Sequence, residues 1–102
     1  MDKVLKKLNQ TYDKDNFLSM LMEESGELIQ ACNKYRRSVR HKRKKLQITS
    51  LKKKDAYENL KEEIVDVEIS ISLLKKSLGI SEKELRHIKT EKLKKANKRL
   101  KK

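Results

Sequence analysis

Apolar residues recur through the first third of the chain at the spacing of an α-helix. From position 17 to position 35 they advance by three, four or seven residues: Phe17, Leu21, Leu28, Ala31 and Tyr35. Because an α-helix turns once in about 3.6 residues, this spacing places them on one face. With Asp15 or Asn16 as a suitable N-cap, the pattern predicts a long amphipathic helix.

Two apolar patterns compete in the segment before Gly79. A strand-like period of two is carried by Val65, Val67, Ile69, Ile71 and Leu73. A helical set is equally clear: Leu60, Ile64, Val67, Ile71, Leu74 and Leu78. About 25 residues without a turn signal are too many for an ordinary strand. We therefore expect a helix that begins between Leu51 and Ala56 and ends at Leu78, with Gly79 as its terminating residue.

Shorter signals flank these two helices. Met1 to Gln10 predicts a leading helical turn or two that packs on the rest of the chain. Ser81, with Glu84 three residues later, forms a capping box, so a third main helix should begin directly after Gly79. Seven of the ten residues from Arg36 to Lys45 are cationic, and their mutual repulsion predicts that the first long helix frays there.

The composition supports an all-α fold. The chain has no proline and two glycines, which leaves little of the turn chemistry that a sheet needs. Its 102 residues, 35% of them hydrophobic, predict a single domain with a thin core. We expect an antiparallel helical bundle of three main helices per chain, in which Phe17 to Tyr35 packs on Leu51 to Leu78. Another subunit should cover the exposed side of Ile64 to Leu78, giving a homodimer or tetramer.

Charge is distributed unevenly. The net charge is +13, yet residues 16–35 carry −2 and residues 55–78 carry −3, while residues 36–54 carry +10 and residues 79–102 carry +7. This alternation differs from the uniform basicity of a simple nucleic-acid-binding arm. The single cysteine, Cys32, is expected to be a small buried residue. Without a signal-peptide pattern or a membrane-spanning run, we expect a soluble cytoplasmic protein.

Carboxylates interrupt the apolar face of both long helices. Glu24 lies on the apolar line of the first helix, with Glu27 three residues later, and Glu63 and Asp66 repeat this arrangement on the second helix. Two helices packed face to face would bring these four carboxylates together, and Mg²⁺ would relieve their repulsion. The alternative is that these acids are solvated or pair with the many lysines. A second acidic pair on the most apolar helix favours the metal.

The two acidic segments also resemble a known family. EESGELIQA at Glu23 to Ala31 and NLKEEIVDVEI at Asn59 to Ile69 are similar to the EExxE and ExxD motifs of MazG-type all-α nucleoside triphosphate pyrophosphohydrolases. The likeness covers roughly Asp15 to Leu100. It implies Mg²⁺-dependent hydrolysis of an NTP or dNTP to a nucleoside monophosphate and pyrophosphate, with Mn²⁺ as a substitute, in control of the nucleotide pool.

The resemblance also implies roles for the acidic residues that match the motifs. The implied magnesium ligands are Glu24, Glu27, Glu63 and Asp66. The flanking acids that would help to position a metal-bound water are Glu23 and Glu62. The 35 residues between Glu27 and Glu63 depart from the family's spacing, which leaves the base and sugar specificity open.

Two basic segments resemble parts of the family that bind the phosphates of the substrate. CNKYRR at Cys32 to Arg37 is similar to a basic tract in compact, often phage-borne, members of this family. A phage-borne protein would be located in the cytoplasm of the host. The segment Cys32 to Arg37 supplies the phosphate-binding candidates Lys34, Arg36 and Arg37. KLKKANKRL at Lys92 to Leu100 resembles a C-terminal motif that contacts the triphosphate. It supplies the candidates Lys95, Asn97 and Arg99.

Other interpretations stay open at this point. A basic helical protein could grip DNA or RNA nonspecifically through Arg36 to Lys54 and Lys89 to Lys102. A catalytically silent relative could bind nucleotides and use the metal only for stability. Tyr35 and Tyr57 could stack on a base or belong to the core. Both histidines lack a metal-ligand spacing and are expected at the surface.

Overall fold

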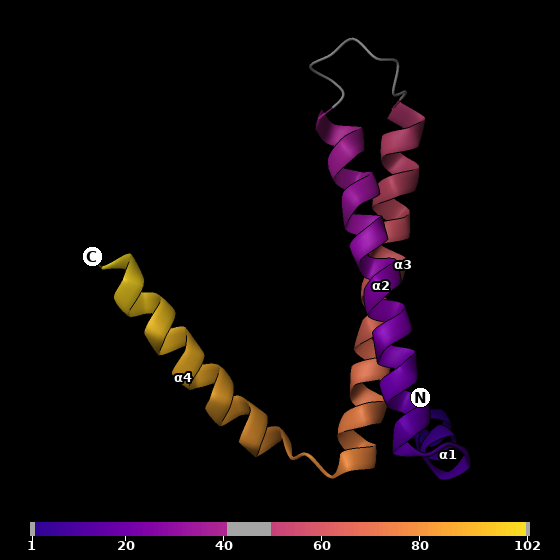
Figure 1. The fold of residues 1–102 in the computed structure, drawn as a ribbon, viewed down its shortest axis with the longest axis vertical. Helices are drawn as coiled ribbons and strands as arrows, with labels where there is room; N and C mark the ends of the chain where they lie inside the picture. The colour runs from indigo at the N-terminus through magenta and orange to yellow at the C-terminus, as the bar shows by residue number, and fades with distance from the viewer. Residues whose placement is uncertain (1, 41–49, 102) are drawn as a thin grey trace.

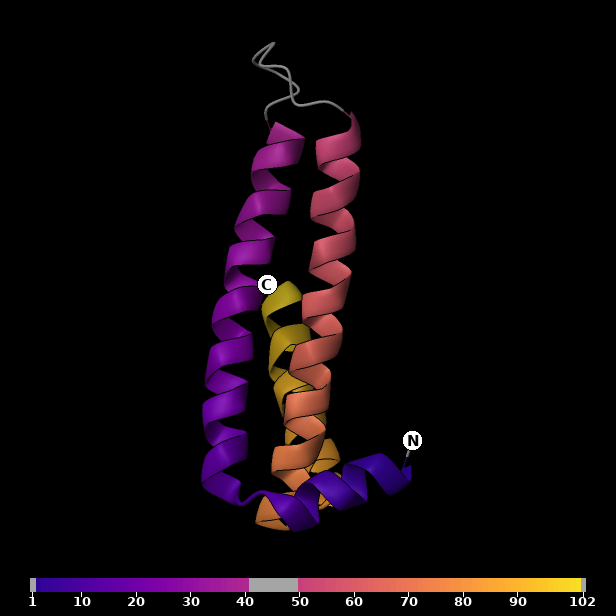
Figure 2. The ribbon, with the colours of Figure 1, turned by 90° about the vertical axis from the view of Figure 1, so that its right-hand side faces the viewer.

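The computed structural model describes residues 2–40 and 50–101, and these residues form four α-helices. The helices are α1 (Asp2–Thr11), α2 (Lys14–Arg40), α3 (Ser50–Leu78) and α4 (Glu82–Leu100). Helices α2 and α3 lie side by side as an antiparallel hairpin, α1 crosses its base, and α4 extends away from it (Figures 1 and 2). The all-α prediction is confirmed. The strand alternative for the segment before Gly79 is wrong, because this segment is helical throughout.

Helix α2 begins earlier and ends later than the sequence pattern predicts. The backbone N–H of Asn16 donates to Asp13 Oδ1 at 3.0 Å, and the backbone N–H of Asp13 donates to Asn16 Oδ1 at 3.1 Å. Asp13 therefore caps the helix, and the expectation of Asp15 or Asn16 as N-cap is wrong. The helix also continues through Arg36 to Arg40, because packing on α3 holds Ser38 buried. Residues 41–45, the rest of the predicted fraying segment, lie outside the described residues.

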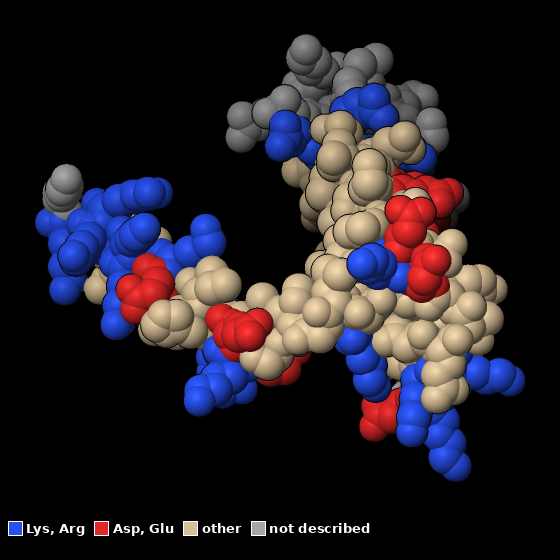
Figure 3. All heavy atoms as spheres, turned by 60° about the horizontal axis from the view of Figure 1, so that its bottom comes forward, with Lys and Arg blue, Asp and Glu red and all other residues tan. Residues whose placement is uncertain are grey.

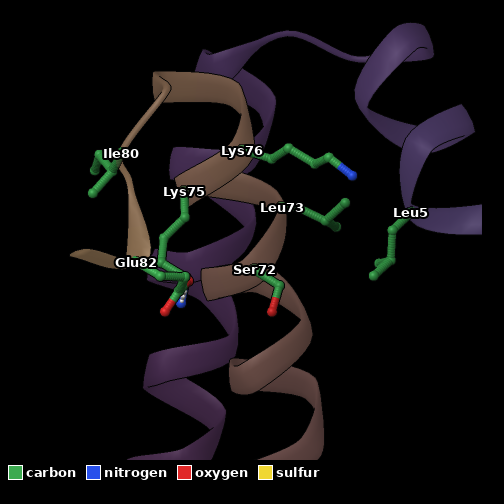
Figure 4. Close-up of a pocket in the computed structure, with 7 residues that line it drawn as sticks. All are labelled: Leu5, Ser72, Leu73, Lys75, Lys76, Ile80 and Glu82. Atoms are coloured by element: carbon green, nitrogen blue, oxygen red, sulfur yellow. Dashed lines mark ion pairs between the residues drawn. The ribbon is translucent and has the colours of Figure 1, made fainter. Parts of the chain in front are cut away.

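The connection from α3 to α4 follows the predicted signals. Gly79 has a φ of 68°, a left-handed conformation that glycine adopts without strain, and the Ile80 N–H donates to the Lys75 carbonyl at 2.9 Å. Ser81 Oγ accepts a hydrogen bond of 3.1 Å from the Glu84 N–H, as the capping box predicts. An ion pair of 2.8 Å between Lys75 and Glu82 joins the two helices (Figure 4).

The core of one chain is small. Among the residues whose burial is described, the buried hydrophobic ones are Phe17, Ala31 and Leu73, all between α2 and α3. Helix α1 is held on α3 by a hydrogen bond of 3.3 Å from Asn9 Nδ2 to the Leu73 carbonyl, as its predicted packing requires. Leu5 of α1 points toward Leu73 across a hollow of about 260 Å³ (Figure 4).

Two expectations about packing are wrong for a single chain. Helix α4 packs against no other helix in the described part of the chain, and none of its residues is buried, so it does not complete the bundle. Cys32 is exposed rather than buried. A single layer of two helices covers only a narrow strip of each, and Cys32 lies at the border of that strip. Within residues 2–40 and 50–101, no helix is long and apolar enough to cross a membrane.

Candidate metal centre

Heptad spacing carries two glutamates into the interface between α2 and α3. Glu24 lies seven residues after Phe17 and seven before Ala31, both fully buried, so the three share one line of the helix. Glu63 lies seven residues before Ser70, which is also buried. Both glutamates are half-buried in the hairpin. The sequence therefore folds two carboxylates toward each other where apolar side chains would normally meet.

The structure brings three of the predicted ligands into one cluster. One carboxylate oxygen from each of Glu24, Glu63 and Asp66 lies within 4.8 Å of the other two. Asp66 is exposed and occupies the rim of the cluster. The Oε2 atoms of Glu24 and Glu63 are buried and have no hydrogen-bond partner. A buried polar atom without a partner is uncommon, since its lost hydration is not replaced.

The local electrostatics are unfavourable for charged carboxylates. Partial desolvation raises the pKa of Glu24 above its ordinary value of 4.5, and the charges of Glu27 and Asp66 raise it further. The pKa of Glu63 is raised for the same reasons in the same order. The charge of Glu27 therefore acts on both groups, although Glu27 is exposed and lies outside the cluster of three. Among the described residues, no lysine or arginine is a cause of these two shifts in pKa.

The residues of the cluster fit a hard divalent cation. Mg²⁺ prefers oxygen ligands at about 2.1 Å, so two oxygens on one ion lie at most about 4.2 Å apart. The 4.8 Å limit of the cluster is close to this value, and small side-chain rotations would close the difference. The two unpartnered Oε2 atoms would gain a partner in the ion. Glu24, Glu63 and Asp66 can therefore hold Mg²⁺ or Mn²⁺, and a ligand role for Glu27 stays a prediction.

The flanking acids lie outside this cluster. Glu23 and Glu62 are both exposed, so each can meet solvent or a substrate. Glu62 lines a shallow hollow of about 290 Å³ on the outer side of α3, together with Asp66 of the cluster. The role of Glu23 and Glu62 in positioning a metal-bound water stays a prediction.

The predicted phosphate-binding residues fall into two groups. Lys34, Arg36 and Arg37 are exposed on the last turns of α2. Lys34 lies seven residues after Glu27, which places it on the same side of α2 and about 10 Å further along the helix. The other group, Lys95, Asn97 and Arg99, is exposed on α4. Because α4 packs on neither α2 nor α3 among the described residues, one chain does not bring this second group to the carboxylates.

An aromatic pair lies above the carboxylates along the hairpin. The rings of Tyr35 and Tyr57 are 5.9 Å apart, tilted by 43°, and Lys61 Nζ lies 4.8 Å from the centre of the Tyr57 ring. The contact between the two rings was not predicted from the sequence, because only the packing of α2 on α3 joins them. Tyr57 is 48% exposed, so a core role does not account for its whole surface. Stacking on a base stays a prediction.

Among the described residues, no histidine belongs to the metal centre, and the comparisons with known proteins give no match. His87 is exposed on α4, as expected, and His41 lies outside the described residues. Comparison of the chain with protein-family models, with curated proteins and with solved structures finds no match.

Proposed function

We propose that this protein is a Mg²⁺-dependent nucleoside triphosphate pyrophosphohydrolase of the MazG type. The observation that supports the proposal is the cluster of Glu24, Glu63 and Asp66 on two antiparallel helices, with two buried oxygens that lack partners and with Glu27 close enough to raise both glutamate pKa values. Carboxylates this close together repel one another and oppose helix packing, which a bound cation would relieve. The type of reaction is inferred from the resemblance of the two acidic segments to the EExxE and ExxD motifs.

Each group of residues has a defined part in the proposed reaction. The four carboxylates hold the ion, which when bound would neutralise phosphate charge and make water more acidic. Glu23 and Glu62, as exposed carboxylates beside the ligands, would orient the attacking water and accept its proton. Lys34, Arg36 and Arg37 would bind phosphate oxygens that the carboxylates repel. An NTP or dNTP would thus be cleaved to a monophosphate and pyrophosphate.

The proposal includes a homo-oligomer. Exposed apolar residues form rows on α2 and α3 at a spacing of four or seven: Leu18, Met22, Ile29, Ile64, Ile71 and Leu78. At about 100° per residue, these rows lie on the side of the hairpin opposite to Glu27 and Asp66. In Figure 3 the side of the hairpin toward α4 is largely free of charge, and red acidic spheres gather on the other side. A second copy would cover this apolar face across a two-fold axis.

A panel of NTPs and dNTPs incubated with Mg²⁺ tests the activity. We expect release of monophosphate and pyrophosphate from at least one nucleotide. Glu24→Gln and Asp66→Asn keep the shape of each side chain and remove one negative charge, so turnover should fall by about two orders of magnitude or more. Glu68→Gln makes the same charge change on an exposed site of α3 and should leave turnover unchanged.

A second candidate function is favoured by α4. This helix carries eight Lys or Arg against three Glu, and all its basic residues are exposed. Such a helix could bind nucleic acid nonspecifically through phosphates. If no nucleotide is cleaved and Glu24→Gln binds DNA or RNA as the parent does, with a steep salt dependence, the binding function replaces the hydrolase.

A further inference from the structure

The outer side of α3 offers a docking surface beside the carboxylate cluster. The hollow of about 290 Å³ is lined by Glu58, Lys61, Glu62, Val65 and Asp66. Val65 is 52% exposed, and Ile69, one turn later, is 41% exposed. The surface thus has apolar residues beside a mostly acidic border, and Asp66 belongs both to this border and to the cluster.

Helix α4 has the complementary features. At about 100° per residue, its apolar side chains fall within an arc of about 140°. They are Leu85, Ile88, Leu93, Ala96 and Leu100. Lys95 and Arg99, four residues apart, line one border of this arc. The helix therefore combines an apolar strip with a basic edge, where the α3 surface combines apolar residues with an acidic edge.

The α4 helix of the same chain points away from this surface. The left-handed Gly79 and the 2.8 Å ion pair between Lys75 and Glu82 set the direction in which α4 leaves α3. Figures 1 and 2 place α4 on one side of the hairpin and α1 on the opposite side. In Figure 3 the acidic residues of the hairpin gather on the side away from α4.

The dimensions of the chain agree with an open arrangement. Its radius of gyration is 18.2 Å, whereas a compact chain of about 100 residues has about 13 Å. Every residue of α4 except the half-buried Leu85 is exposed. An amphipathic helix with no packing partner in its own chain leaves its apolar strip in water, which a second chain would relieve.

We propose that α4 is an exchanged arm that docks on α3 of a second copy of this chain. The apolar arc of α4 packs on Val65 and Ile69, and its basic edge faces Glu62 and Asp66. Lys95 and Arg99 then come to the carboxylate cluster of the other copy. The docking stands without any activity, whereas its consequence, a catalytic site shared between two chains, rests on the proposed function.

Cross-linking tests the docking directly. In chains with Cys32→Ser, one chain carries Val65→Cys or Ile69→Cys, and a second chain with a size tag carries Ala96→Cys. After coexpression and treatment with a short bismaleimide, we expect a cross-linked species of the mixed size. Lys94→Cys, nearly opposite to Ala96 on α4, is the matched control and should cross-link several-fold less. Equal cross-linking at both α4 positions, or the absence of a species of the mixed size, would overturn the docking.

Complementation tests the shared site. Chains with Glu63→Gln lack a cluster ligand, and chains with Lys95→Ala and Arg99→Ala lack the basic edge, so each should be inactive alone. In coexpressed mixtures half of the dimers are mixed and each has one intact composite site, so about a quarter of the parent activity should return. An active parent whose mixture stays inactive would overturn the shared site and leave the hydrolase in place. If the parent itself is inactive, the proposed function fails, and cross-linking alone decides the docking.

Discussion

Glu24 and Glu63 occupy heptad positions at which the neighbouring members, Phe17, Ala31 and Ser70, are buried. Either glutamate could have been replaced by an apolar residue without a change in the helix. Their partly buried carboxylates oppose the packing of α2 on α3, because each is desolvated and lies near another acid. Selection of a destabilising group at a packed position is typical of a functional site.

Removing one of these charges should separate stability from function. We expect Glu24→Gln to raise the melting temperature of the metal-free protein, since it relieves repulsion at the helix interface. The same change should weaken Mg²⁺ binding by about tenfold or more. Thermal melts with EDTA and with Mg²⁺ measure both effects. Glu68→Gln, the exposed control, should change neither, and a lower melting temperature of Glu24→Gln in EDTA would contradict the prediction.

The two raised pKa values also predict how stability depends on pH. Between 4.5 and the raised pKa of Glu24 and Glu63, the folded protein binds more protons than the unfolded chain. The free energy of unfolding therefore falls as pH rises through this window. In EDTA, the melting temperature should increase as pH is lowered from about 7 toward about 5. Lys75 lowers the pKa of Glu82, so Glu82 loses its stabilising effect only below 4.5.

The variant Glu24→Gln with Glu63→Gln is the control for this dependence. It has no carboxylate left at the two shifted positions, so its melting temperature should change less over the same range. An unchanged slope in this variant would assign the pH dependence to other groups.

Helix boundaries were predictable where a local signal sets them and less so where packing does. Gly79, Ser81 and Glu84 act through their own backbone and side chains, and the structure has the turn and cap that they predict. The end of α2 at Arg40 was missed, because contact with α3 outweighs the repulsion among cations. The heptad positions of Glu24 and Glu63 were evident from spacing. The tyrosine pair was not, since it joins two helices.

At concentrations low enough to keep the chains apart, so that α4 is not docked on a second copy, the cap of α4 should matter more than most caps. Because α4 has no packing within the described chain, local interactions such as the hydrogen bond from the Glu84 N–H to Ser81 Oγ hold its first turn. Ser81→Ala should destabilise the helix by about 1 kcal/mol, whereas Ser81→Thr should retain most of the stability. Hydrogen exchange of the amides in residues 82–88 measures the effect. Equal protection in Ser81→Ala and the parent would show that another contact, such as a docked partner, holds the helix.

The sequence indicates that each long helix has more apolar surface than one partner can cover, but not which chain covers the rest. Leu85, Ile88 and Leu93 of α4 fit the core of a bundle equally well within one chain or between two. The expectation of a packed third helix failed for this reason. A core of Phe17, Ala31 and Leu73 with the half-buried residues around it is small for a chain of 102 residues. The proposed association would then supply much of the stability.

Association of this kind makes stability depend on protein concentration. The apolar rows of α2 and α3 include Ile29, which is 63% exposed, beside the polar and exposed Gln30. If a second copy covers Ile29, Ile29→Lys buries a charge at the interface and should convert the oligomer to monomers at micromolar concentration. Gln30→Lys introduces the same charge one residue away, on the other side of α2, and should leave the oligomer intact.

The melting temperature of the parent and of Gln30→Lys should rise with protein concentration, because only the folded chain associates. The melting temperature of Ile29→Lys should be lower and should not depend on concentration. Sedimentation equilibrium and melts over a hundredfold concentration range measure both. A parent that sediments as a monomer throughout, with a constant melting temperature, would contradict the oligomer and leave the two-helix core to account for the fold alone.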